Sequence, residues 1–165
     1  MRLALLALAG LFAAVTVPAT AADEALTLTA RGTVQIAFTP GDDAAGLIIE
    51  AIRKARKQVW VQAYSFTHTD IAQALVDAKQ RGLDVQMIAD PQQMERVASS
   101  KTAWLAEQGV PVWLDAEHAA AHNKVILIDL GTPEVAVITG SFNFSLAAQH
   151  RNAENLLILR GNPTL

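Results

Sequence analysis

The stretch His122-Asn-Lys-Val-Ile-Leu-Ile-Asp129, followed after a turn by Gly140-Ser-Phe-Asn-Phe-Ser145, decides both the fold and the candidate site. Side chains two residues apart share one face of a strand, so His122 and Lys124 would point the same way, as would Ser141 and Asn143. The Gly and Pro between the two runs predict a hairpin loop. Such a hairpin would gather an imidazole, an ammonium and two neutral hydrogen-bonding groups, a set that suits a phosphate group.

The rest of the chain alternates between strand-like and helical patterns. Apolar runs and turn residues predict strands at 33–38, 59–66, 84–89, 109–114, 122–129, 135–139 and 155–159. Helical spacing predicts helices at 46–58, 69–81, 91–108 and 145–150. Pro111 places the strand at 109–114 near a sheet edge. This order predicts an α/β fold with a mixed β-sheet, largely parallel in its first half.

The pattern His-x-Lys-x-x-x-x-Asp followed by Gly-Ser-x-Asn closely resembles the signature of the phospholipase D superfamily. His122, Lys124 and Asp129 match its first half, and Gly140, Ser141 and Asn143 match its second half. The single copy in a short chain resembles the small bacterial, Nuc-like endonuclease branch. One departure is the ten residues between Asp129 and Gly140, where the family usually has about six. A longer loop costs little, roughly 0.6 kcal/mol per doubling of its length.

The resemblance implies a sheet with helices on both faces, a phospholipase D-like α-β-α sandwich. It also implies a metal-independent phosphodiesterase without a cofactor, in which His122 attacks phosphorus and forms a covalent phosphohistidine. Lys124 and Asn143 would hold the phosphoryl oxygens, and Ser141 would bind phosphate or orient a neighbour. Glu154 is the candidate acid that fixes the His122 tautomer. Asp129, an odd number of residues from His122, would face away from it and support the site from the turn or a dimer contact.

The reaction needs a second imidazole to protonate the leaving oxygen. One signature supplies one histidine, and single-signature members of the family obtain the second by pairing two chains. The resemblance therefore implies a C2 homodimer with His122 of both copies facing each other. The expected substrate is DNA or RNA, hydrolysed as by a non-specific endonuclease. A phospholipase D-type hydrolase of phospholipid headgroups is the alternative.

The first 21 residues have the form of a signal peptide. Arg2 precedes an apolar run from Leu3 to Val17, and an Ala-x-Ala site ends at Ala21. The run is too short for a comfortable membrane span, although an uncleaved anchor is the alternative. We therefore expect a periplasmic or secreted protein in which residues 22–165 form one phosphodiesterase domain. Asn162-Pro163 reads as the start of a helix that does not follow, which predicts C-terminal truncation and a partly uncovered sheet.

Composition narrows the possibilities further. The chain has 13 basic and 16 acidic residues, and loss of Arg2 with the leader would change the net charge from −3 to −4. This balance argues mildly against tight general binding of nucleic acid, although the basic cluster at 53–57 leaves room for a local patch. Without cysteine, the fold has no disulfide and the site no thiol.

Two other classes of function remain open. His118 and His122 are four residues apart and could share a zinc ion on a helix, although the strand pattern directly after them argues against it. A catalytically silent binding module that keeps the fold is the other alternative. His118 is expected on a loop near the cleft mouth, His68 in the pocket or at a turn, and His150 on the surface.

Overall fold

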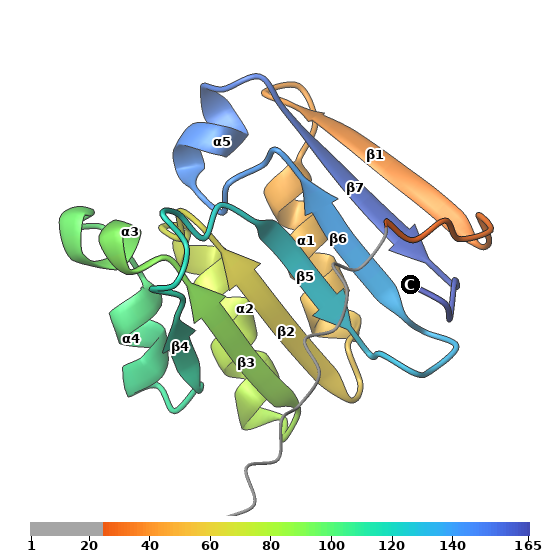
Figure 1. The fold of residues 1–165 in the computed structure, drawn as a ribbon, viewed down its shortest axis with the longest axis horizontal. Helices are drawn as coiled ribbons and strands as arrows, with labels where there is room; N and C mark the ends of the chain where they lie inside the picture. Colours follow the sequence, from red (N-terminus) through yellow and green to blue (C-terminus); the bar gives the residue numbers. More distant parts are fainter. Residues whose placement is uncertain (1–24) are drawn as a thin grey trace, which may run out of the picture.

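The computed structural model describes residues 25–165, which form a seven-stranded mixed sheet (Figure 1). The predicted signal peptide, residues 1–21, lies outside the described residues. The strands are β1 (Thr33–Thr39), β2 (Gln58–Ala63), β3 (Asp84–Ala89), β4 (Val112–Leu114), β5 (Lys124–Ile128), β6 (Ala136–Gly140) and β7 (Glu154–Arg160). Their order across the sheet is β1-β7-β6-β5-β2-β3-β4.

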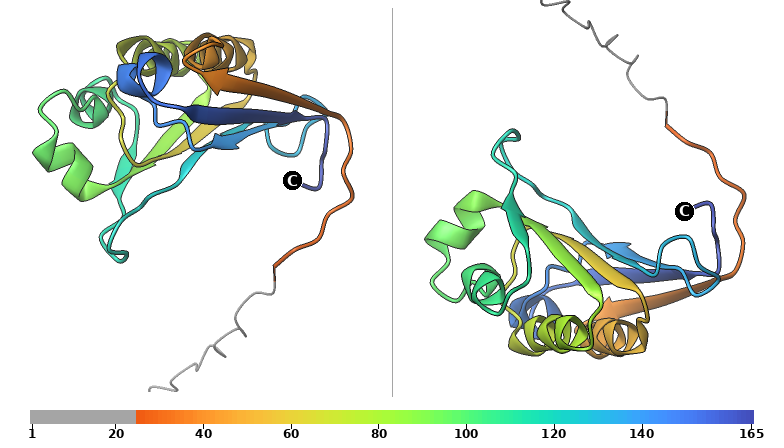
Figure 2. Two further views of the ribbon diagram at one scale, coloured as in Figure 1. Left: turned by 90° about the horizontal axis from the view of Figure 1, so that it is seen from above. Right: turned by 90° about the horizontal axis from the view of Figure 1, so that it is seen from below.

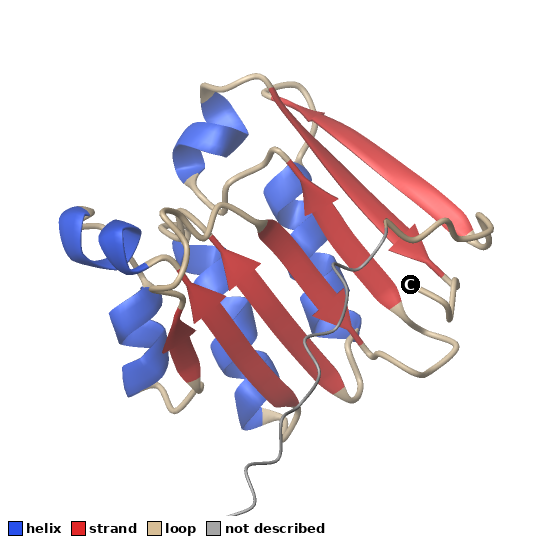
Figure 3. Ribbon diagram, in the orientation of Figure 1, coloured by secondary structure: helices blue, strands red, loops and turns tan. Residues whose placement is uncertain are grey.

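Strand directions follow the expected division of the chain. β2, β3 and β4 run parallel, whereas the β2–β5, β5–β6, β6–β7 and β7–β1 pairs are antiparallel. The α/β fold with a mixed sheet is therefore confirmed, β4 is an edge strand, and β5 and β6 form the predicted hairpin. Because β5 returns from the parallel half, it begins where β2 and β3 end (Figure 3).

The helices are α1 (Ala44–Lys54), α2 (Thr69–Gln80), α3 (Pro91–Arg96), α4 (Thr102–Glu107) and α5 (Leu146–His150). Local capping explains several of their starts: the Asp43 carboxylate accepts a hydrogen bond from the Gly46 N–H, and Ser145 Oγ accepts from the Ala148 N–H. The single helix predicted at 91–108 is instead two short ones. The first helix ends at Arg96, because Val97 is extended. The Lys101 N–H, at the N-cap of α4, donates to the Phe66 carbonyl, so a tertiary contact fixes the start of the second helix.

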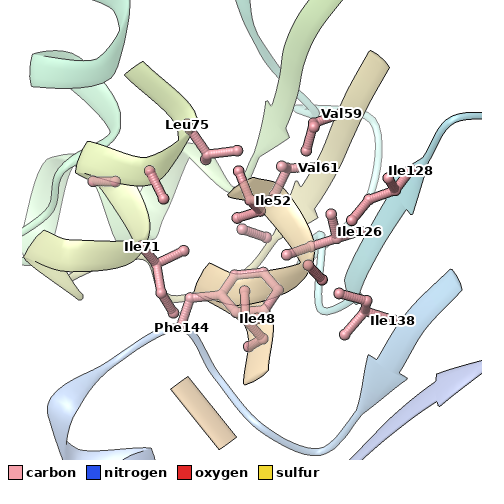
Figure 4. Close-up of a cluster of buried hydrophobic side chains, with 14 of the residues drawn as sticks. Ile48, Ile52, Val59, Val61, Ile71, Leu75, Ile126, Ile128, Ile138 and Phe144 are labelled. Atoms are coloured by element: carbon pink, nitrogen blue, oxygen red, sulfur yellow. The ribbon is translucent and has the colours of Figure 1, made fainter. Parts of the chain in front are cut away.

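The hydrophobic core lies between the sheet and the pair α1 and α2. Alternate residues of the strands, such as Val59, Val61, Ile126, Ile128 and Ile138, point at these helices (Figure 4). From the helices, Ile48, Ile52, Ile71 and Leu75 fill the same layer and are fully buried. Each such side chain contributes about 1.5–3 kcal/mol by leaving water, so this layer sets the strand register and with it the position of the signature residues.

The expected helices on both faces of the sheet are not seen within residues 25–165. Figure 2 shows α1, α2 and α5 on the same side of the sheet. The opposite face, formed by the other alternate residues, carries apolar side chains that remain accessible, such as Trp60 (37% exposed), Ile88 (41%) and Ile36 (54%). We refer to this surface, which also includes Trp113, Val125 and Leu127, as the open face. Trp60 and Trp113 are therefore not core residues in this structure.

Among residues 25–165, the structure contains no helix with both the length and the hydropathy needed to cross a membrane.

Candidate active site

The signature residues gather at one edge of the sheet, where β2 and β6 end and β5 and β7 begin (upper edge in Figure 1). The register places Lys124 opposite Ala63 of β2, and Val125 opposite Thr139 of β6. An open pocket of about 430 Å³ lies there. It is lined by His122, Asn123, Lys124, Val125, Thr139, Gly140, Ser141, Asn143 and Glu154. The β5–β6 hairpin and the start of β7 thus bring together five of the six predicted site residues: His122, Lys124, Ser141, Asn143 and Glu154.

Lys124 is the cation of the pocket and is mostly buried, with 7% of its surface exposed. Its Nζ donates to the His122 carbonyl at 2.6 Å and lies 3.0 Å from His122 Nδ1 and 3.3 Å from Nε2. Burial lowers the pKa of Lys124, and the negative charge of Glu154 opposes that shift. The ammonium is therefore held close to the histidine and only partly hydrated, which strengthens its attraction for a phosphoryl oxygen.

His122 lies just before β5 and is exposed. An ammonium can donate only to an imidazole nitrogen that carries a lone pair, so the contact with Lys124 suits a neutral ring. His122 also contacts an aromatic side chain: the Tyr64 ring centroid lies 4.3 Å from the His122 ring centroid. Tyr64 is absent from the set of site residues predicted from the sequence. It directly follows a strand that pairs with β5, which is the signal that could have found it.

Gly140, the last residue of β6, and Ser141 contact the start of β7. Gly140 has φ +146°, and a Cβ there would lie 2.3 Å from the Asn155 carbonyl oxygen, so only glycine fits. Ser141 Oγ accepts from the Asn155 N–H at 3.0 Å, and the Ser141 N–H donates to Asn155 Oδ1 at 3.2 Å. Ser141 is thus engaged with Asn155, a residue absent from the predicted set, and orients the segment that begins with Glu154.

Asn143 supplies a neutral polar group to the pocket. Its Oδ1 is buried and has no hydrogen-bond partner among residues 25–165. Buried polar atoms are almost always paired in folded proteins, so the Asn143 oxygen retains the capacity to accept a hydrogen bond from a group that enters the pocket. The neighbouring backbone is fixed, because the Ser145 N–H donates to the Asn143 carbonyl at 2.7 Å.

Glu154 lines the pocket but forms no hydrogen bond with His122 in this structure. Its Oε1 accepts from Asn152 Nδ2 at 3.0 Å. Its charge acts on the site through Lys124, whose ammonium it favours. In this structure Lys124, and not Glu154, lies next to the His122 ring nitrogens. That Glu154 fixes the His122 tautomer therefore remains a prediction.

The structure does not bring Asp129 into the pocket, although Asp129 belongs to the catalytic set predicted from the sequence. It follows the last residue of β5, at the end opposite to His122, with φ +51°. Its buried carboxylate accepts from the backbone N–H groups of Arg56, Lys57 and Gln58 at 2.7–3.2 Å. Asp129 therefore ties the hairpin to the start of β2, a supporting position at a turn.

The remaining histidines lie apart from the pocket. His118 is exposed, and its Nδ1 lies 2.9 Å from Asp115 Oδ2. His68 is the N-cap residue of α2 and is 5% exposed, and burial lowers its pKa. His150 ends α5 and is exposed. In the part of the chain from residue 25 onward, no three His, Cys, Asp or Glu side chains cluster as metal ligands would.

Comparison with known proteins agrees with this geometry. A family profile described as "Cardiolipin synthase, PLD-like domain" matches residues 48–165. The crystal structure of a phospholipase D family member, Nuc from Salmonella typhimurium, is 37% identical with a TM-score of 0.72, covering 80% of this chain and 85% of that one. NucT from Helicobacter pylori is 28% identical with a TM-score of 0.68, covering 80% of this chain and 87% of that one.

Curated relatives carry lipid-related names. A protein named "Phospholipase D" from Rickettsia prowazekii is 36% identical over 78% of this chain, and the human "Mitochondrial cardiolipin hydrolase" is 27% identical over 72%. The chain covers 60% and 45% of the lengths of these two relatives. The family profile, the likeness to Nuc and the ordered signature at one sheet edge lead to one conclusion: the chain belongs to the phospholipase D superfamily.

Proposed function

We propose that this chain is an exported, metal-independent phosphodiesterase that cleaves DNA or RNA as a non-specific endonuclease. The observation that carries the proposal is the pocket itself, where an exposed imidazole, a partly buried ammonium and an amide with an unpaired oxygen meet. These groups match the needs of phosphoryl transfer: a nucleophile, positive charge beside the phosphoryl oxygens and an adaptable hydrogen-bonding group.

In the proposed reaction, a neutral His122 nitrogen attacks phosphorus, and the bond from phosphorus to the leaving oxygen breaks. A protonated imidazole gives its proton to that oxygen, so the first product leaves as an alcohol. The same imidazole, now neutral, takes a proton from water as the water attacks the phosphohistidine and frees His122. Lys124 stabilises the negative charge on the phosphoryl oxygens in both steps.

The second imidazole is proposed to come from a second copy of the chain. Among the described residues that line the pocket, His122 is the only histidine, and its exposure leaves it free to face another copy. A homodimer would therefore build one reaction centre from two His122 side chains.

Mixing experiments test this requirement. If wild type is mixed and re-equilibrated with increasing His122→Ala protein, activity should fall with the square of the wild-type fraction, because a mixed dimer lacks one imidazole. A fall in simple proportion to the wild-type fraction would show that each chain works alone. Light scattering of wild type and variant checks that both assemble equally.

A supercoiled-plasmid nicking assay in EDTA tests the nuclease activity and its metal independence together. We expect wild type to nick DNA in EDTA and His122→Ala to be inactive. Nicking that needs added metal would contradict the phosphohistidine mechanism and favour the zinc alternative. Retained binding of DNA without turnover by wild type would instead favour the binding module.

Phospholipid hydrolysis is the second candidate, and one structural observation favours it. The open face bears an apolar hollow of about 350 Å³ lined by residues including Trp60, Ile88 and Trp113, and Val125 lines both this hollow and the catalytic pocket. An acyl chain could lie there while its phosphate reaches His122. The Rickettsia and human relatives named for phospholipid hydrolysis add support.

Vesicles of phosphatidylcholine or cardiolipin separate the two substrates. Hydrolysis of these lipids, but not of plasmid DNA or RNA, would favour the lipid alternative. In that case Trp113→Ala should slow lipid hydrolysis, because it removes apolar contact area, and should leave the cleavage of a small soluble phosphodiester unchanged.

Export is proposed from the leader pattern of residues 1–21. Expression of the full sequence in a Gram-negative host should place the protein in the periplasm or medium, with an N-terminus at Ala22. A protein that stays in the cytoplasm with Met1 intact would contradict export, and one retained uncut in the membrane would favour the anchor.

A further inference from the structure

Tyr64 is the only tyrosine of the chain and lies next to the two central groups of the site. It follows β2, whose last residue Ala63 pairs with Lys124. Its N–H donates to the Asn123 carbonyl at 3.1 Å, which extends the β2–β5 ladder to the residue between His122 and Lys124. The backbone position of Tyr64 is therefore fixed relative to the signature.

The ring of Tyr64 contacts both functional side chains. Its centroid lies 4.3 Å from that of the His122 imidazole, with the planes tilted by 52°. Lys124 Nζ lies 5.1 Å from the centre of the same ring. The first distance is slightly shorter than the range of about 4.5–7 Å that is usual for aromatic pairs, so the two rings are in close contact. The second distance lies within the range of cation–π contacts.

We infer that Tyr64 is a positioning residue, whose aromatic ring orients the His122 imidazole and stabilises the Lys124 ammonium. This inference rests on the proposed function of His122 and Lys124. Tyr64 itself donates no proton and forms no bond in the reaction. The contacts are made by the face of the aromatic ring. A phenylalanine at position 64 should therefore retain the function of Tyr64, whereas an aliphatic side chain should not.

The site needs such a residue because His122 is otherwise loosely held. The imidazole is exposed, and apart from Tyr64 its described side-chain contact is with Lys124, whose ammonium also binds the phosphoryl oxygens in the proposed reaction. A ring that packs against the imidazole restricts its rotation before substrate arrives, which keeps the reacting nitrogen in an attack geometry. Burial disfavours the charged form of Lys124, and the electron-rich ring face partly offsets that cost.

The matched pair Tyr64→Phe and Tyr64→Leu tests the inference without substrate. In proton NMR spectra, the His122 ring protons should show a ring-current shift in wild type that Tyr64→Phe keeps and Tyr64→Leu loses. Their signals are assigned by their absence in His122→Ala. An unchanged His122 spectrum in a folded Tyr64→Leu protein would overturn the inference.

Kinetics supply the second readout. Tyr64→Leu should lower kcat about tenfold or more, because misorientation of a reacting group acts on the chemical step, with KM nearly unchanged. Tyr64→Phe should stay within about twofold of wild type, since the ring face remains. The alkaline fall in activity should begin at lower pH in Tyr64→Leu, because loss of the ring disfavours the ammonium further.

A purely structural role for Tyr64 predicts a different result. Tyr64→Leu would then lower the melting temperature and the active fraction, without moving the alkaline limb of the pH profile, and that outcome would overturn the inference. If wild type hydrolyses neither nucleic acids nor lipids, the proposed function fails. The NMR comparison would still decide whether Tyr64 orients His122.

Discussion

Both ends of β5 carry polar residues of the same signature, but the hydrogen-bonding environment of these residues differs between the two ends. At the end near residue 129, the Asp129 carboxylate is buried and accepts hydrogen bonds from three backbone amides. At the other end, His122 is exposed, Lys124 is buried beside it, and Asn143 Oδ1 has no partner within residues 25–165. Saturated polar groups stabilise a fold, whereas under-satisfied ones retain binding capacity for a ligand. The signature therefore combines a structural half and a chemical half.

The largest expected effect lies at His122, the exposed end of this comparison. His122→Ala should lower phosphodiester hydrolysis at least about a thousandfold, close to 4 kcal/mol of transition-state stabilisation, because the nucleophile is lost. Stability in urea should barely change, since the side chain is exposed. The matched control is His118→Ala, which should keep full activity. Equal losses in both variants would instead indicate a shared metal.

Lys124 should show the next largest effect. Lys124→Met should slow hydrolysis about a hundredfold, because the charge beside the phosphoryl oxygens is lost. Burial lowers the pKa of Lys124, so the active ammonium loses its proton at lower pH than an ordinary lysine, and wild-type activity should fall correspondingly early on the alkaline side. A pH–rate profile of wild type and variant checks this prediction. The variant should lack the alkaline fall in activity that deprotonation of Lys124 causes in wild type.

The same residue gives a stability test with a defined sign. The folded state disfavours the Lys124 ammonium, so between the lowered pKa and the ordinary lysine value the unfolded chain binds more protons, and stability from this group rises with pH. Lys124→Met removes that dependence. Urea unfolding is measured for both proteins in a series from pH 7 upward. At pH 7 the variant should be at least as stable as wild type. If Lys124→Met were clearly less stable than wild type at pH 7, Lys124 would have a structural role rather than a chemical one.

Asp129 should show the reverse behaviour. Asp129→Ala should cost about 2 kcal/mol in the free energy of unfolding, because it leaves buried N–H groups unpaired. It should leave kcat per folded molecule unchanged. Asp129→Asn should cost less, because asparagine tolerates φ +51° and retains one acceptor oxygen. A large loss of kcat in fully folded Asp129→Asn would show that the two ends are functionally coupled.

The smallest effect is expected at Ser141, which lines the pocket but whose hydroxyl already accepts a hydrogen bond from the backbone. Ser141→Ala removes the acceptor of the Asn155 N–H and should cost about 1 kcal/mol of stability, the usual net value of one hydrogen bond. Activity should fall only severalfold, through looser placement of Glu154. A hundredfold loss with unchanged stability would mean that the Ser141 hydroxyl contacts the phosphate directly.

Much of the site could be predicted from the sequence because its residues are close along the chain. His122 and Lys124 are two residues apart, and one hairpin brings Ser141 and Asn143 to them. Tyr64 and Asn155 were missed because their roles arise from pairing between separated strands. The single helix predicted at 91–108 was wrong for a similar reason, since the Lys101 N–H between the two short helices pairs with the Phe66 carbonyl of a separate segment.

The sequence by itself determined the strand alternation, the hairpin and the identity of the groups that meet phosphate, because period-two spacing and turn residues act locally. The tertiary structure decided which of these groups stay unsatisfied. It placed Asp129 against the backbone of residues 56–58, the Tyr64 ring against His122, and an apolar open face beside the pocket. These outcomes depend on which strands become neighbours, and that choice is made by burial of the shared core rather than by any local pattern.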